Sequence, residues 1–168
     1  MAEQRAPDPT LMARLQLSVK GVDWAASLLR PSQHQSLEGE WTAHQVVFHL
    51  IANERIFQGR VAQALAEEGP AFVRWDSLAD MQAGHRPEPD IDVLAAEFMA
   101  LRTATYETFK SLSSEQWART ATWPDGRVID LAWIAEKVLW HALDHFAGLL
   151  DLHGEFAPRQ AMPAEHGR

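Results

Sequence analysis

Apolar residues recur at helical spacing in four long stretches of the chain, and no stretch shows the sustained alternation typical of a strand. Four amphipathic helices without strands predict an all-α fold, a four-helix bundle. The helices are expected at Pro9–Leu29, Thr42 to about Glu67, about Asp90 to about Leu112, and about Asp130 to His153.

Two of these helices begin at recognisable capping residues. Asp8 is followed by Pro9, which suits an N-cap and the first helical position. Thr42 and Gln45 have the spacing of a capping box, in which each side chain bonds to the other residue's backbone N–H. These residues predict the starts of the first and second helices.

The connection between the second and third helices is unusually long. It reads EEGPAFVRWDSLADMQAGHRPEP and covers residues 67–89, whereas most connections in compact domains are much shorter. Long connections of this kind often cover a site or contain a short helix, which residues 77–83 could form. The connection between the third and fourth helices is expected to contain a turn at residues 113–116 and a break at WPDG.

The composition limits the class of protein. We expect one helical domain over residues 1–168, with about 155–168 as a frayed tail. The start of the chain does not resemble a signal peptide and no apolar run is long enough to span a membrane, so a cytoplasmic protein is the default expectation. The net charge is −8 and the basic residues do not cluster, so nucleic acid and membranes are not expected as partners.

The apolar run VLWHALDHFAGLLDL contains two histidines four residues apart, His141 and His145. This spacing places both on one side of a helix, toward the core. A single histidine in such a position is more often a core residue with satisfied ring nitrogens than a metal ligand. Two together are harder to explain as core residues, and a metal site would need a third ligand.

The best third ligand is His49, about two turns into the second helix, because His44 in the first turn is expected to face solvent. The chain has no cysteine, so any metal must be held by histidine and oxygen. Imidazole ligands favour a divalent ion such as zinc, nickel or iron. Three protein ligands leave a coordination position open, which is typical of catalytic sites.

Three segments resemble a known family, the DinB-like (damage-inducible) metalloprotein superfamily. They are EWTAHQVVFHLIANE at residues 40–54, SLSSEQWART at residues 111–120 and WHALDH at residues 140–145. The resemblance implies an up-down-down-up four-helix bundle, often dimeric, with a divalent metal bound by His49, His141 and His145. It also implies activities such as transfer of bacillithiol or mycothiol to electrophiles, and mycothiol-dependent isomerisation.

The three histidines favour a metal-dependent enzyme, and the resemblance implies in the first place a low-molecular-weight thiol S-transferase acting on a small-molecule substrate with a thiol cosubstrate. A metal-dependent hydrolase that uses bound hydroxide, and a non-catalytic metal-binding or sensor domain, are the alternatives. Asn53, Glu54 and Asp144 are candidates for general base or for residues that support the metal ligands, although solvated surface groups are the simpler interpretation. The chain shows no other nucleophile.

Two tryptophans on the fourth helix raise the question of assembly. Trp133 and Trp140 are seven residues apart, so they lie on nearly the same side of the helix, away from the core stripe. They are expected to pack either beneath the long connection or against a second copy of the chain. Together with the resemblance, this favours a homodimer.

Overall fold

The computed structural model describes residues 8–157, and its architecture is a bundle of four long helices. The all-α four-helix fold predicted from the sequence is thereby confirmed. The long helices are α1 (Pro9–Leu29), α2 (Ala43–Ala66), α4 (Ile91–Ser111) and α6 (Leu131–Phe156). The shorter elements are η1 (Arg30–Ser32), α3 (Ser77–Gly84), α5 (Ser114–Trp117), β1 (Thr120–Thr122) and β2 (Val128–Asp130).

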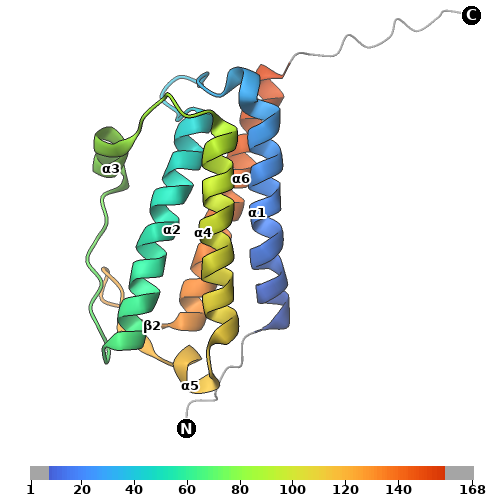
Figure 1. The fold of residues 1–168 in the computed structure, drawn as a ribbon. Coiled ribbons are helices and arrows are strands. Elements are labelled where there is room, and N and C mark those ends of the chain that lie inside the picture. The colour runs from blue at the N-terminus through green and yellow to red at the C-terminus, as the bar shows by residue number, and fades with distance from the viewer. Residues whose placement is uncertain (1–7, 158–168) are drawn as a thin grey trace, which may run out of the picture.

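The helices follow the up-down-down-up order (Figure 1). α1 rises, α2 and α4 both descend, and α6 rises again. Because α2 and α4 run in parallel, the chain that leaves α2 must return along the whole length of the bundle before α4 begins. This return accounts for the length of the connection. The return carries α3, which lies outside the bundle beside α2. The short helix expected within the connection is therefore present, one residue longer than predicted.

The capping residues act as the sequence predicts. The Asp8 carboxylate accepts a hydrogen bond from the backbone N–H of Thr10. The Thr42 hydroxyl accepts from the N–H of Gln45 at 3.1 Å, and the Gln45 side chain accepts from the N–H of Thr42 at 2.9 Å. These bonds satisfy donors that lack a partner within the helix, so both helix starts are set by local sequence.

The segment before α6 contains more structure than the sequence indicates. Instead of a simple break at WPDG, β1 and β2 form an antiparallel hairpin in which Thr122 pairs with Val128. Gly126 lies in the turn with a φ of 90°, a conformation that side chains disfavour. Strands of three residues are too short to show an alternating pattern, which explains why the sequence indicates only a break at this point.

The end of α6 also differs from expectation. The helix continues beyond His153 to Phe156, so residues 155 and 156, which were expected to belong to a frayed tail, are helical. Ala157 is the C-cap residue of this helix, and residues 158–168 of the proposed tail lie outside the described residues.

The core consists of two apolar clusters separated by a polar layer. At the boundary, the buried Arg102 guanidinium on α4 donates to the Glu54 carboxylate on α2 from Nε at 3.0 Å. Its other nitrogens donate to the Ser18 hydroxyl at 3.1 Å and to the Val138 carbonyl at 3.3 Å. One arginine thus links all four long helices at mid-height of the bundle.

None of the helices within residues 8–157 combines the length and the apolar character needed to cross a lipid bilayer.

Candidate metal centre

The three histidines singled out from the sequence lie together in the structure. His49 comes from α2, and His141 and His145 come from successive turns of α6. Each offers a ring nitrogen that lies within 4.8 Å of the other two. The group forms because α2 and α6 pack against each other with these faces in contact.

Two tryptophans pack against His49 in this cluster. The Trp41 ring, just before α2, lies 4.9 Å from the His49 ring, measured between centroids. The Trp75 ring lies 5.5 Å away and nearly parallel, with an interplanar angle of 9°. Trp75 belongs to the connection between α2 and α4, so this connection does cover a site, as its length led us to expect.

The spacing of two nitrogens fits one shared ion. The Nε2 atoms of His49 and His141 are 3.1 Å apart. Two nitrogens bound to one tetrahedral zinc at about 2.0–2.1 Å would be about 3.3 Å apart. Without an ion, one ring donates its N–H to the other. The three-imidazole donor set therefore fits a divalent borderline metal.

Burial keeps these histidines in the neutral form that binds metal. Burial, reinforced by the neighbouring His145, lowers the pKa of His49 to about 4. Burial and the adjacent His145 and His49 lower the pKa of His141 to about 3. The pKa of His145 is also lowered by burial, against the opposing effect of the Asp144 carboxylate. At neutral pH no proton has to leave before a metal binds.

These pKa values predict that the metal-free protein loses stability as the pH falls from 6.5 through about 4 and toward 3. The unfolded chain binds protons on these histidines below pH 6.5 while the folded chain does not, so acid favours unfolding. Urea denaturation at several pH values, followed by circular dichroism, measures the slope. A His49→Gln, His141→Gln double variant should show a shallower slope. Equal slopes would mean that protonation of these histidines does not cause the loss of stability.

The three residues proposed to assist the site occupy different environments. Asn53 is buried one turn along α2 from His49, and the two residues line one cavity. Glu54 is fully buried and is bound to Arg102, whereas Asp144 is exposed. The interpretation of all three as solvated surface groups was thus wrong for Asn53 and Glu54. The reason is that α2 packs against both α4 and α6, so its buried face is wider than one stripe.

Two buried polar side-chain atoms on α2 have no hydrogen-bond partner among residues 8–157. They are Nδ1 of His49 and Oε1 of Glu54. Metal-binding histidines usually donate their second ring N–H to a carboxylate or carbonyl, which fixes the ring. For His49, the rings of Trp41 and Trp75 pack against the imidazole and restrict its orientation, while Nδ1 has no hydrogen-bond partner among residues 8–157.

His44 does not face solvent, contrary to the sequence-based expectation, and is fully buried. Its Nε2 lies 2.7 Å from the carbonyl oxygen of Pro89, which only accepts, so this nitrogen carries the proton. Nδ1 of His44 therefore accepts from Nε2–H of His85 at 2.8 Å. The first turn of α2 is buried because these two bonds hold the end of α3 and the start of α4 against it.

Replacing His85 with alanine is expected to lower stability by about 1 kcal/mol, because the buried Nδ1 of His44 loses its donor. Metal content should not change, since His85 is not part of the three-histidine group. Thermal denaturation and elemental analysis give the two quantities. A loss of metal in the His85 variant would show that the two groups are coupled.

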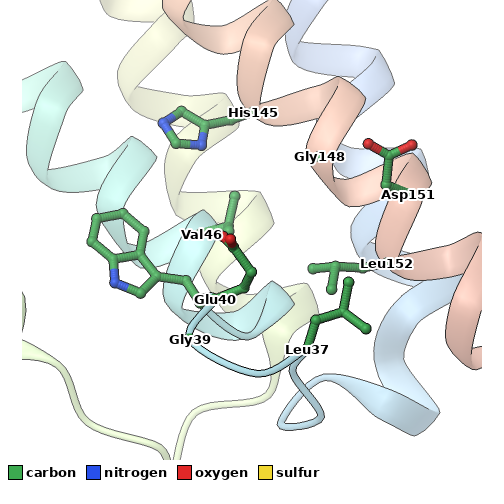
Figure 2. Close-up of a pocket in the computed structure, with 9 residues that line it drawn as sticks. Leu37, Gly39, Glu40, Val46, His145, Gly148, Asp151 and Leu152 are labelled. Atoms are coloured by element: carbon green, nitrogen blue, oxygen red, sulfur yellow. The ribbon is translucent and has the colours of Figure 1, made fainter.

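The cluster opens toward a cavity on each side. Figure 2 shows the first, with His145, Glu40 and Asp151 among the residues in its wall. Trp41 also lines this cavity. The second cavity, of about 360 Å³, is lined by His49 and His141. Two separate spaces therefore reach one group of ligands. Neither was predicted from the sequence, because their walls come from segments far apart in the chain.

Comparisons with known proteins give a consistent result. A family model described as the DinB superfamily matches residues 15–148. YfiT from Bacillus subtilis, described as a probable metal-dependent hydrolase with an unusual four-helix bundle topology, superposes with a TM-score of 0.75 at 22% identity, covering 90% of this chain and 93% of its own. The DinB-like protein YjoA from Bacillus subtilis gives 0.64 at 15% identity, covering 92% and 95%. No curated protein sequence matched.

Proposed function

The chain belongs to the DinB superfamily, and we propose that it is a metal-dependent enzyme whose divalent ion is held by His49, His141 and His145. The observation that carries this proposal is the convergence of three neutral imidazoles, two of them with nitrogens 3.1 Å apart. The histidine-only donor set favours zinc, nickel or iron over calcium or magnesium, which prefer oxygen.

An ion with three protein ligands keeps positions open and, when bound, supplies Lewis acidity that lowers the pKa of a thiol or of water. The chain's own residues provide the surroundings. Trp41 and Trp75 cover His49 and exclude water from it. The Asn53 amide lines the cavity beside His49 and His141, where it offers both a donor and an acceptor to a substrate.

Among enzymes of this kind, we favour a transferase that uses a low-molecular-weight thiol. One cavity is lined by His145 and the other by His49 and His141, so two cavities that reach one group of histidines suit two reactants that meet there. The chain has no cysteine, so the sulfur must come from a cosubstrate. In the transfer, the thiol sulfur forms a bond to an electrophilic carbon, the leaving group departs with the bonding electrons, and the thiol proton passes to solvent.

The alternative is a metal-dependent hydrolase, which the description of YfiT supports. The test incubates zinc-loaded protein with 1-chloro-2,4-dinitrobenzene and a panel of low-molecular-weight thiols, and separately with a p-nitrophenyl ester. Thiol-dependent formation of the dinitrophenyl thioether, lost on chelation, supports the transferase. Ester cleavage that needs no thiol supports the hydrolase. Metal binding without either reaction supports the sensor domain.

A homodimer remains part of the proposal, although only one of the two tryptophans on α6 is free for a subunit contact. Trp133 packs under the hairpin, 4.9 Å from the Trp123 ring, so it is not free for a subunit contact. Trp140 is 52% exposed, with the Arg14 guanidinium over its ring. Leu17, on the neighbouring α1, is 61% exposed.

Trp140→Glu is therefore expected to convert a dimer into a folded monomer, because a carboxylate in an apolar contact is strongly unfavourable. Sedimentation velocity at micromolar concentration measures the mass. Leu78, exposed on α3 away from this face, gives the control Leu78→Glu. A wild-type protein that sediments as a monomer would rule out the dimer.

A further inference from the structure

The cavity beside His49 and His141 has walls from four parts of the chain. α2 contributes His49 and, three turns further along, Arg60, while α6 contributes Lys137 and His141 in successive turns. The connection between α2 and α4 contributes Trp75, and the hairpin contributes Trp123. Its volume of about 360 Å³ is within the range of small-molecule sites.

This cavity is positively charged although the chain as a whole is acidic. Arg60, Arg74 and Lys137 line it, and none of them has a carboxylate within 4 Å among residues 8–157. The one carboxylate in its wall, Asp125, is already paired with Arg127 at 2.7 Å. With a net charge of −8 for the whole chain, this local excess of cations does not reflect composition.

Arg60 is held in place and is not fully hydrogen-bonded. Its guanidinium carbon lies 4.4 Å from the centroid of the Trp123 ring, and Nη2 donates to the Val73 carbonyl at 3.0 Å. Its other N–H groups have no partner among the described residues. A half-buried guanidinium without a counter-charge is a strong donor site for an incoming anion, because charge-assisted bonds gain strength as water is excluded.

Flat aromatic rings line the cavity beside the histidines and beside this cation. Trp75 stacks on His49, and Trp123 stacks under Arg60. Along α2 the rise from His49 to Arg60 is about 16 Å, and along α6 the rise from His141 to Lys137 is about 6 Å. All four residues line the same cavity, so a molecule that fills it lies among the histidines and the cations.

We propose that this cavity binds the substrate as an organic anion, a carboxylate attached to a flat apolar body, with the carboxylate held by Arg60 and its neighbouring cations. The assignment of this anion as substrate rests on the proposed function, whereas its binding requires only residues of the chain. The other cavity, which His145 lines, has the carboxylates of Glu40 and Asp151 in its wall and therefore repels such an anion. It is left to the second reactant.

The test compares binding of trans-cinnamate with that of its neutral analogue cinnamamide by titration calorimetry, on both metal-stripped and zinc-loaded protein. We expect the acid to bind about tenfold or more tightly than the amide, as for a charge-assisted pair. Arg60→Gln should abolish this preference and Arg60→Lys should retain part of it. Arg55 is exposed on α2 and paired with Glu97 outside the cavity, so Arg55→Gln is the matched control.

Equal binding of acid and amide, no binding of cinnamate, or an Arg55→Gln effect as large as that of Arg60→Gln would overturn the proposal. Inorganic phosphate that displaces cinnamate at equal or lower concentration would show a site for small anions instead. If Arg60→Gln fails to fold, the proposal is still tested by the acid–amide comparison on the unmodified protein and on Arg60→Lys. Zinc binding without cinnamate binding defeats this inference alone, and cinnamate binding without zinc binding defeats only the metal proposal.

Discussion

Replacing His141 with alanine is expected to reduce bound metal from about one ion per chain to almost none. The two remaining imidazoles, His49 and His145, leave most of the coordination sphere to water. The affinity for the metal should therefore fall by more than about a hundredfold, which is more than the loss of a hydrogen-bond partner of a metal ligand causes. Elemental analysis by mass spectrometry, on protein purified without an affinity tag and dialysed, measures the occupancy. His49→Ala and His145→Ala should behave in the same way.

The matched controls are histidines outside the group. His34→Ala should keep full metal content, as should His85→Ala despite its effect on stability. The same is expected of His166, which lies outside the described residues. Full metal content in the His145→Ala protein would contradict the site, because the ion would then be held elsewhere.

Replacing Glu54 with leucine is expected to destabilise the fold by about 3–5 kcal/mol, because it leaves the buried Arg102 guanidinium without its counter-charge. The double variant Glu54→Leu, Arg102→Met should recover most of that loss, since two apolar side chains can pack between the two core clusters. Urea denaturation followed by circular dichroism gives the free energy of unfolding for each variant.

An exposed ion pair between the same two helices provides the control. Glu97→Ala removes the partner of Arg55, and the two side chains are 40% and 59% exposed, so stability should change by less than about 1 kcal/mol. A Glu54→Leu effect no larger than that of Glu97→Ala would show that the buried pair does not link the four helices.

Features set by neighbouring residues could be predicted from the sequence. The capping residues Asp8 and Thr42 fixed two helix starts, because their hydrogen bonds involve only the next few residues. The spacing of His141 and His145 placed both on one helix face, since the helical period alone decides it. His49 then followed as the inward-facing histidine on another helix, and the structure brings it to the pair.

Features that depend on distant contacts could not be predicted in this way. His44 is bonded to Pro89 and His85, which lie more than forty residues away in the chain and help to bury it. Glutamate is usually found at the surface, and the burial of Glu54 is explained by the position of Arg102 on α4, which supplies the opposite charge. The cationic cavity likewise combines α2, α6, a long connection and a hairpin, so no local pattern reveals it.

The most direct test of the metal centre is X-ray absorption spectroscopy of the zinc-loaded protein, before and after addition of a low-molecular-weight thiol. We expect three imidazole nitrogens at about 2.0–2.1 Å with oxygen completing the sphere, and a sulfur at about 2.3 Å once the thiol is added. The His141→Ala protein should lack this spectrum. A sphere filled entirely by protein ligands, or the same spectrum in the His141→Ala protein, would contradict an open three-histidine site.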